Sequence, residues 1–129
     1  MVRLIGDEEA LQARDHQLVV NSHRSGCCGI LTLVGELDLA TVEEVGRHVA
    51  ALTQEDPPKH VLVDMVELTF MDSTGLRALL RLKELVNGHV ALIGPRLGVR
   101  KVFDVTGLAD QFPQFADIEA AQEHFHSML

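Results

Sequence analysis

The sequence predicts one α/β domain with a mixed β-sheet, an N-terminal β-hairpin and about four helices. Two observations predict this class. Short β-branched runs alternate with segments whose apolar residues recur every three or four positions, and two strand-like runs near the start are separated by a short turn. A chain of 129 residues is long enough for one domain with its own apolar core. We divide it into an N-terminal extension, residues 1–16, and a folded domain, residues 17–127.

The domain is predicted to begin with the β-hairpin. Residues 17–22 and 28–36 are rich in apolar and β-branched side chains, and the second run is the longer one. Between them, His23–Gly26 contains a serine and a glycine and is predicted as the turn. Because the connection is short, we expect the two strands to be antiparallel.

A change of hydrophobic period then predicts a helix over residues 41–52. Its apolar side chains have the spacing of one helix face, at Val42, Val45, Val49 and Leu52. Thr41 and Glu44 have the spacing of a capping box, while Asp38 is an alternative cap, so the start of the helix stays open. The apolar run at residues 60–65 predicts a buried strand, parallel to the second strand because a helix joins the two.

The rest of the chain continues the alternation of helix and strand. Helix, strand, helix and helix are predicted in that order at residues 73–86, 89–93, 97–105 and 118–126. Asn87-Gly88 ends the first of these helices, Gly107 closes the next, and Asp117 caps the last. The predicted order is β-β-α-β-α-β-α-(β)-α, with two βαβ units behind the hairpin.

The net charge of the chain limits the kinds of partner that it can be expected to bind. The formal net charge of −8 disfavours binding to nucleic acid and to anionic membranes, and leaves a protein or a cationic surface open. The chain has no apolar run of membrane-spanning length, and its acidic N-terminus does not resemble a secretory signal. Adjacent Cys27 and Cys28 do not suit a disulfide framework, so we expect reduced structural thiols in a cytoplasmic protein.

Two loops that each lead into a predicted helix are the candidate functional segments, residues 35–41 and 70–76. The first follows the second predicted strand, and the polar residues of the second follow the apolar pair Phe70-Met71. We expect both loops at the same end of the sheet. Asp72 and Ser73 stand at a helix start. One interpretation makes them ordinary helix caps. The other makes Ser73 an exposed hydroxyl where the helix dipole favours negative charge, and hence a site that tolerates a phosphate.

Other chemistry is not indicated. His124 and His126 diverge on a helix, and the remaining histidines show no metal-ligand spacing. The glycines match neither a nucleotide-binding loop nor a dinucleotide fingerprint, and Ser73 lies in no nucleophile elbow. We therefore predict no enzyme, no catalytic residue, no metal and no cofactor.

A resemblance to a known family rests on three motifs. Met71-Asp72-Ser73-Thr74-Gly75-Leu76 resembles the signature of STAS-domain anti-sigma-factor antagonists. Gly35-Glu36-Leu37-Asp38, followed by Thr41, resembles the family's other marked loop. The third motif is the closing pattern, which is similar at Gly94-Pro95, at Val99 to Phe103 and at Thr106-Gly107-Leu108. The resemblance covers about residues 17–127 and implies a single STAS-like domain.

The resemblance also implies a function. Such proteins capture an anti-sigma factor that is also a serine kinase, and phosphorylation of the motif's first serine, Ser73 here, releases it and is reversed by a serine phosphatase. The implied partner-binding residues come from both loops: Asp38, Leu39, Thr41, Asp72, Ser73, Thr74, Leu76 and Arg77. We expect a monomer or weak dimer. Arg77 departs from the pattern, because many relatives carry a second glycine there.

Three rival functions remain. A STAS domain also serves as a non-switching scaffold subunit of a signalling or lipid-transport complex. An enzyme on a small α/β scaffold would need a second catalytic partner for Ser73, which the sequence does not supply. A nucleotide-binding domain would need a phosphate-binding glycine loop.

Overall fold

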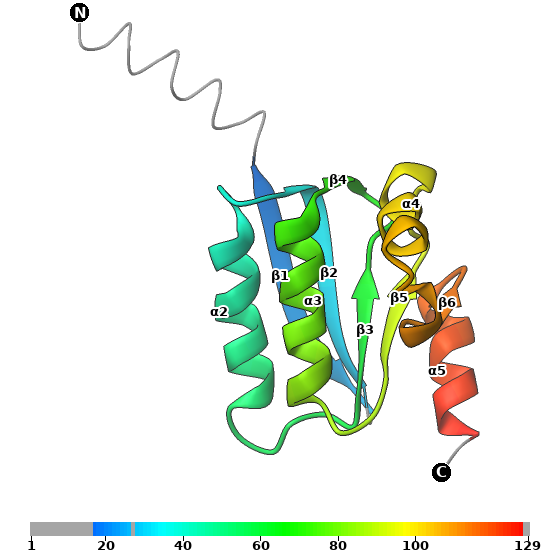
Figure 1. Cartoon of the computed structure of the whole chain (residues 1–129). Coiled ribbons are helices and arrows are strands. Elements are labelled where there is room, and N and C mark those ends of the chain that lie inside the picture. Colours follow the sequence, from blue (N-terminus) through cyan, green and yellow to red (C-terminus); the bar gives the residue numbers. More distant parts are fainter. Residues whose placement is uncertain (1–16, 27, 128–129) are drawn as a thin grey trace, which may run out of the picture.

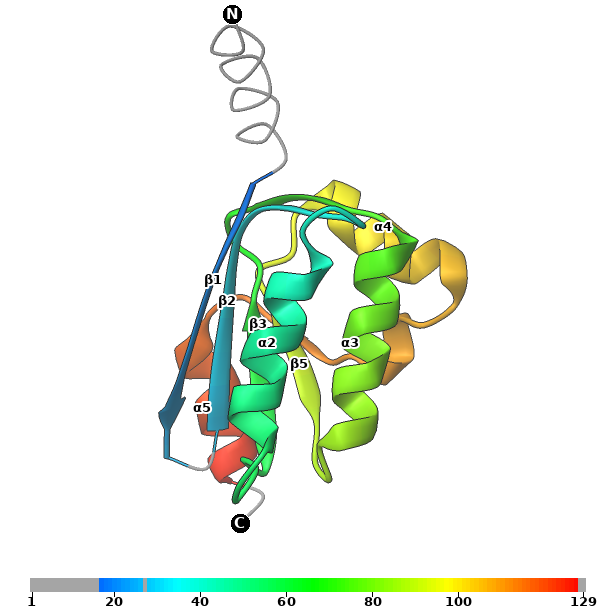
Figure 2. The same ribbon diagram turned by 90° about the vertical axis from the view of Figure 1, so that its left-hand side faces the viewer.

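The computed structural model describes residues 17–26 and 28–127, and it confirms an α/β domain with a mixed sheet (Figures 1 and 2). The predicted extension at residues 1–16 and Cys27 lie outside the described residues. The strands are β1 (Leu18–Ser25), β2 (Cys28–Leu37), β3 (His60–Asp64), β4 (Leu68–Met71), β5 (Val90–Ile93) and β6 (Gln114–Phe115). The helices are α2 (Val42–Thr53), α3 (Ser73–Leu85), α4 (Leu97–Thr106), the 3₁₀ turn η1 (Ala109–Gln111) and α5 (Ile118–His126).

The sheet is mixed because only the first strand pair is antiparallel. β1 and β2 form the predicted hairpin, and β2, β3, β5 and β6 follow as parallel neighbours in the order β1-β2-β3-β5-β6. β4 lies off this path and pairs in parallel with the last residues of β2. The helical connections give the parallel pairs that were predicted.

One sequence prediction about strands was wrong, and one strand was missed. The turn predicted at His23–Gly26 is shorter, because β1 continues through Ser25, which pairs with Cys28. The polar end of β1 is exposed, so pairing rather than burial holds it in the strand. β4 was not predicted, because its four residues do not alternate: Leu68 and Met71 are buried and the two between them are exposed.

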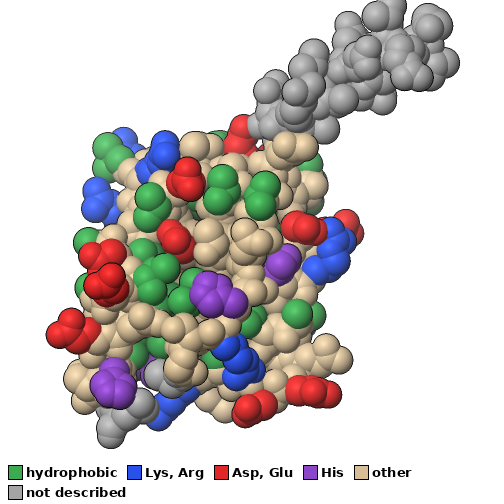
Figure 3. Space-filling view, turned by 180° about the vertical axis from the view of Figure 1, so that it is seen from behind, with side chains coloured by type: hydrophobic (Ala, Val, Ile, Leu, Met, Phe, Trp, Pro, Cys, Tyr) green, Lys and Arg blue, Asp and Glu red, His purple; other side chains and the backbone are tan. Residues whose placement is uncertain are grey.

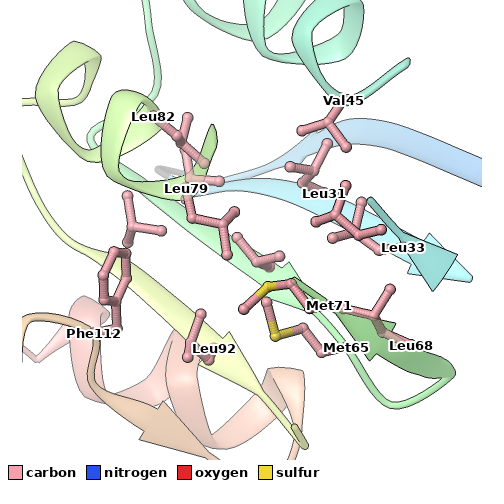
Figure 4. Close-up of a cluster of buried hydrophobic side chains, with 14 of the residues drawn as sticks. Leu31, Leu33, Val45, Met65, Leu68, Met71, Leu79, Leu82, Leu92 and Phe112 are labelled. Carbon is pink, nitrogen blue, oxygen red and sulfur yellow. The ribbon is translucent and has the colours of Figure 1, made fainter. Parts of the chain in front are cut away.

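The helices cover the two faces of the sheet unequally. Helices α2, α3 and α4 lie on one face, and α5 lies on the other (Figure 2). The larger core fills the first face, where apolar side chains from α2 and α3 point toward β2 and β3 (Figure 4). A smaller cluster under α5 contains Cys28, Ile30, Leu62, Ala91, Ile93, Ala121 and Phe125. Figure 3 views the molecule from this second side, where hydrophobic and histidine side chains lie among charged ones.

Candidate functional site

The two candidate loops meet at one end of the sheet, which we call the carboxyl edge and define as residues 38–41 and 72–76. Leu37 and Met71 are paired at the ends of β2 and β4, so Asp38 and Asp72 follow directly from paired residues. The backbone N–H of Asp72 also donates to the carbonyl oxygen of Leu37 over 3.2 Å. Strand pairing therefore brings together two loops that are more than thirty residues apart, as expected.

Ser73 is the first residue of α3 and is exposed. The residue before it, Asp72, is the N-cap, and its Oδ1 accepts the backbone N–H groups of Thr74 over 2.9 Å and of Gly75 over 3.3 Å. Such a cap satisfies donors that the first helical turn leaves without partners. Asp72 therefore fits the capping interpretation, whereas the Ser73 side chain caps nothing and faces solvent.

The other loop is held by a different set of hydrogen bonds. The Thr41 hydroxyl donates to the carbonyl oxygen of Glu36 over 2.8 Å and accepts the backbone N–H of Asp38 over 3.0 Å. Asp38 Oδ1 accepts the backbone N–H of Ala40, also over 3.0 Å. Thr41 is the N-cap of α2 but makes no side-chain cap hydrogen bond, so the predicted capping box with Glu44 was wrong. The Thr41 hydroxyl stabilises the loop and does not cap the helix.

Gly75 and Leu76 form the packed underside of the carboxyl edge. A Cβ at Gly75 would lie 2.7 Å from the Cγ atoms of both Leu37 and Met71, which explains a glycine inside the first turn of α3. Leu76 is only 5% exposed and belongs to the main core. It supports the loop from below and offers little surface to a partner.

Two exposed apolar side chains flank the polar groups of the edge. Leu39, from the first loop, is 75% exposed, and Phe70, from β4, is 46% exposed. Phe70 pairs with Glu36 and precedes the Met71-Asp72 turn, so it belongs to the same surface. Phe70 lies in the candidate segment 70–76 but was not among the expected partner-binding residues, although an aromatic residue next to a polar loop is a usable sign of a binding surface.

The group with a clearly altered pKa lies away from this edge. Burial, and then the charges of His89, Lys59 and His124, lower the pKa of His60 below its ordinary value of 6.5. His60 begins β3 at the opposite end of the sheet, which we call the amino edge and define as residues 59–60 and 88–89. His60 therefore has no part in the carboxyl edge.

The described part of the chain holds neither a metal-binding cluster nor a membrane-spanning helix. No group of three or more His, Cys, Asp or Glu side chains there is arranged to hold a metal ion. None of the described helices is long and apolar enough to cross a membrane. Among the described residues, the candidate site is thus made of loop backbone, hydroxyls, carboxylates and exposed apolar groups.

The sheet order and the two loops at one edge define an α/β domain of the STAS type. The chain belongs to the STAS domain family, whose model matches residues 19–121. It is 34% identical over 82 residues to an anti-sigma F factor antagonist of Lysinibacillus sphaericus, covering 61% of this chain and 70% of the relative.

Solved structures give the same fold. The anti-sigma factor antagonist SpoIIAA in its unphosphorylated form superimposes with a TM-score of 0.69 at 27% identity, covering 84% of this chain and 97% of that one. The Bacillus cell fate determinant SpoIIAA in the phosphorylated form has a TM-score of 0.64 at 23% identity, covering 83% and 98%. The second likeness concerns the fold alone.

Proposed function

We propose that this chain is an anti-sigma factor antagonist whose binding is switched off by phosphorylation of Ser73. In its unmodified form it captures an anti-sigma factor that is also a serine kinase, and this frees a sigma factor for transcription. The kinase moves the γ-phosphoryl group of ATP to Ser73 Oγ, so that ADP leaves and the partner takes the hydroxyl proton. A serine phosphatase restores the hydroxyl. The exposed Ser73 hydroxyl on the carboxyl edge carries this proposal.

The comparisons support the proposal through what they say of relatives. A relative of this chain is an anti-sigma F factor antagonist, and SpoIIAA has been solved in an unphosphorylated and in a phosphorylated form. In this chain the residue available for the same modification is Ser73, because it is exposed while its neighbours Asp72 and Thr74 are half-buried.

We assign the partner surface to the exposed part of the carboxyl edge together with the adjacent residues Phe70 and Arg77. Leu39 and Phe70 supply exposed apolar contact area. Asp38 and Arg77 supply charges of opposite sign. Contacts of this kind combine an apolar centre with a polar rim, which is the usual composition of a protein interface.

The charge of a phosphate explains release. Phosphorylation adds about −1.5 to −2 charges. An unpaired charge inside a dry interface costs several kcal/mol, and each ~1.4 kcal/mol is a tenfold loss of affinity. Because Ser73 is exposed in the free protein, the same phosphate there keeps its water and has little effect on folding.

The test compares affinity capture from the protein's own cell extract by wild type, Ser73→Ala and Ser73→Asp. We expect Ser73→Ala to retain the partner in the presence of ATP, wild type to lose it, and Ser73→Asp to bind weakly throughout. Mass spectrometry of wild type after incubation with the captured kinase and ATP should place one phosphate on Ser73. Thr74→Ala is the matched control and should still be phosphorylated.

The rival scaffold function gives a different result in the same experiment. A non-switching STAS subunit would bind its partner equally well as wild type, Ser73→Ala and Ser73→Asp, with or without ATP. A phosphate found on a residue other than Ser73 would also contradict the proposed switch.

A further inference from the structure

One face of α3 carries Ser73 and two arginines in a single row. Ser73, Arg77 and Arg81 are spaced four residues apart and all three are exposed, while the buried residues of α3 lie on the other side at Gly75, Leu76, Leu79 and Leu82. Residues four apart on a helix have Cβ atoms about 5–6 Å from each other. Arg77 is therefore the nearest residue of the row to Ser73, one turn along the helix.

Two backbone N–H groups at the start of α3 are already bonded and are not available to a phosphate on Ser73. The Asp72 carboxylate already accepts the N–H groups of Thr74 and Gly75, over 2.9 and 3.3 Å. A phosphate on the next residue would lie beside that carboxylate and repel it. Asp72 already occupies the positive end of the helix dipole, so a phosphoserine at this position would gain from a nearby cation.

Arg77 is the cation that is placed to supply it. Arg47 forms an ion pair with Glu44, and Arg96 donates through Nε to the carbonyl oxygen of Val66 over 3.0 Å. Arg77 makes no hydrogen bond or ion pair with any residue that the structure describes. Side chains on a helix lean toward its N-terminus, so the Arg77 guanidinium can reach toward Ser73. An anion four residues before a cation is also the more favourable order of the pair.

We infer that Arg77 binds the phosphate of phosphorylated Ser73 within the free protein, as an ion pair between successive turns of α3. This inference rests on the proposed modification of Ser73 and says how the modified state is held. A guanidinium matches two phosphate oxygens with two parallel hydrogen bonds, which a glycine at this position cannot do. Phosphorylation then changes the partner surface twice, since it adds negative charge and withdraws the exposed Arg77 from contact.

The experiment places phosphoserine at residue 73 by genetic-code expansion, so that no kinase is needed. The phosphate is titrated by ³¹P NMR in the full chain, in the Arg77→Gln variant and in Arg81→Gln. Without Arg77 the titration midpoint should rise by up to about 0.4 pH at physiological salt, as expected for a pair between successive helix turns. Arg81 is the matched control: it lies about 12 Å from residue 73 along the helix, beyond the screening length at physiological salt, and its loss should not move the midpoint.

Two results would overturn the inference. An unchanged midpoint in Arg77→Gln would show that no pair forms, and equal rises in Arg77→Gln and Arg81→Gln would show a general effect of charge. Because the phosphoserine is built in, neither result depends on the kinase. A kinase that ignores Ser73 refutes the proposed function, whereas an unchanged midpoint refutes only the role of Arg77.

Discussion

The two edges of the sheet connect strands to helices in different ways. At the carboxyl edge, Asp38, Thr41 and Asp72 hydrogen-bond within their own loops and leave Ser73 exposed. At the amino edge, His60 is buried and Gly88 is half-buried, although Lys59 and His89 are exposed. His60 is 2% exposed and stacks on Phe125 with ring centroids 4.4 Å apart.

This difference separates binding from stability. The carboxyl edge keeps its shape through local hydrogen bonds, so an exposed side chain there can change without disturbing the core. The buried part of the amino edge has less freedom, because His60 stacks on Phe125 of α5 and accepts the backbone N–H of His89. Substitutions at the amino edge should therefore cost more stability than substitutions at the carboxyl edge.

Gly88→Ala should have the largest effect and is the strongest test of the contrast. A Cβ there would overlap the carbonyl oxygen of Lys59 and lie 2.6 Å from His60 Nδ1. Overlap with backbone cannot be relieved by a rotamer change, so we expect a loss of about 3 kcal/mol in the free energy of unfolding, measured by urea denaturation. Gly46→Ala is the control, since nothing lies within 4 Å of its Cβ inside α2.

The control should behave in the opposite way. Alanine is preferred over glycine in a helix by about 1 kcal/mol, so Gly46→Ala should raise the free energy of unfolding. A Gly88→Ala protein as stable as wild type would show that the backbone of the amino edge can move to make room for a Cβ. The two edges would then not differ in their tolerance of substitutions.

Asp72→Ala should have a smaller effect, about 1 kcal/mol, because it removes the cap of α3 but leaves the core intact. Urea denaturation measures the loss, and Asp72→Asn is the matched variant because its side-chain oxygen can still accept the two N–H groups. If Asp72→Ala were as damaging as Gly88→Ala, the carboxyl edge would not be the tolerant one.

The sequence alone was sufficient for the elements that bury a regular apolar pattern. Val45, Val49 and Leu52 recur at helical spacing and are buried in α2, and Asp117 caps α5 as predicted, with the Ala120 N–H donating to its Oδ1 over 2.8 Å. These features involve residues that are close in sequence, and periodicity and capping patterns describe such residues.

Features that depend on distant residues could not be predicted in the same way. β4 exists because its backbone pairs with the end of β2, and its four residues show no alternation. Thr41 had the spacing of a helix cap, but its hydroxyl bonds the backbone of Glu36 and Asp38 instead. The two loops were each found from their residues, whereas the exposure of Phe70 within the second loop became clear only from the structure.

Acid should destabilise the protein through the amino edge. His60 Nδ1 accepts the backbone N–H of His89 over 3.0 Å, so a proton on Nδ1 would break that bond. The pKa of His60 is lowered in the fold from 6.5, mainly by burial. Near pH 6.5, His60 therefore binds a proton in the unfolded chain but stays neutral in the native protein. The free energy of unfolding falls as the pH drops through that value.

The expected size of this effect is roughly 0.7 kcal/mol at most between pH 7 and pH 6, because one proton is involved. Urea denaturation at both pH values should show it in wild type and in the exposed-residue control His126→Asn. In His60→Asn the drop should shrink, since asparagine accepts the same N–H but does not titrate. An unchanged drop in His60→Asn would assign the acid sensitivity to another group.

Asp38→Asn should have the smallest effect on stability, within about 0.5 kcal/mol. The asparagine side-chain oxygen can still accept the Ala40 N–H that Asp38 Oδ1 accepts over 3.0 Å, so the loop keeps its fold. Its negative charge is lost, however, and if the proposed partner surface is correct, capture of the anti-sigma factor should weaken. Thermal unfolding and affinity capture on the same preparation separate the two effects. A fall in melting temperature as large as that of Asp72→Ala would mean that the Asp38 charge holds the loop, and the carboxyl edge would then lose its separation of binding from stability.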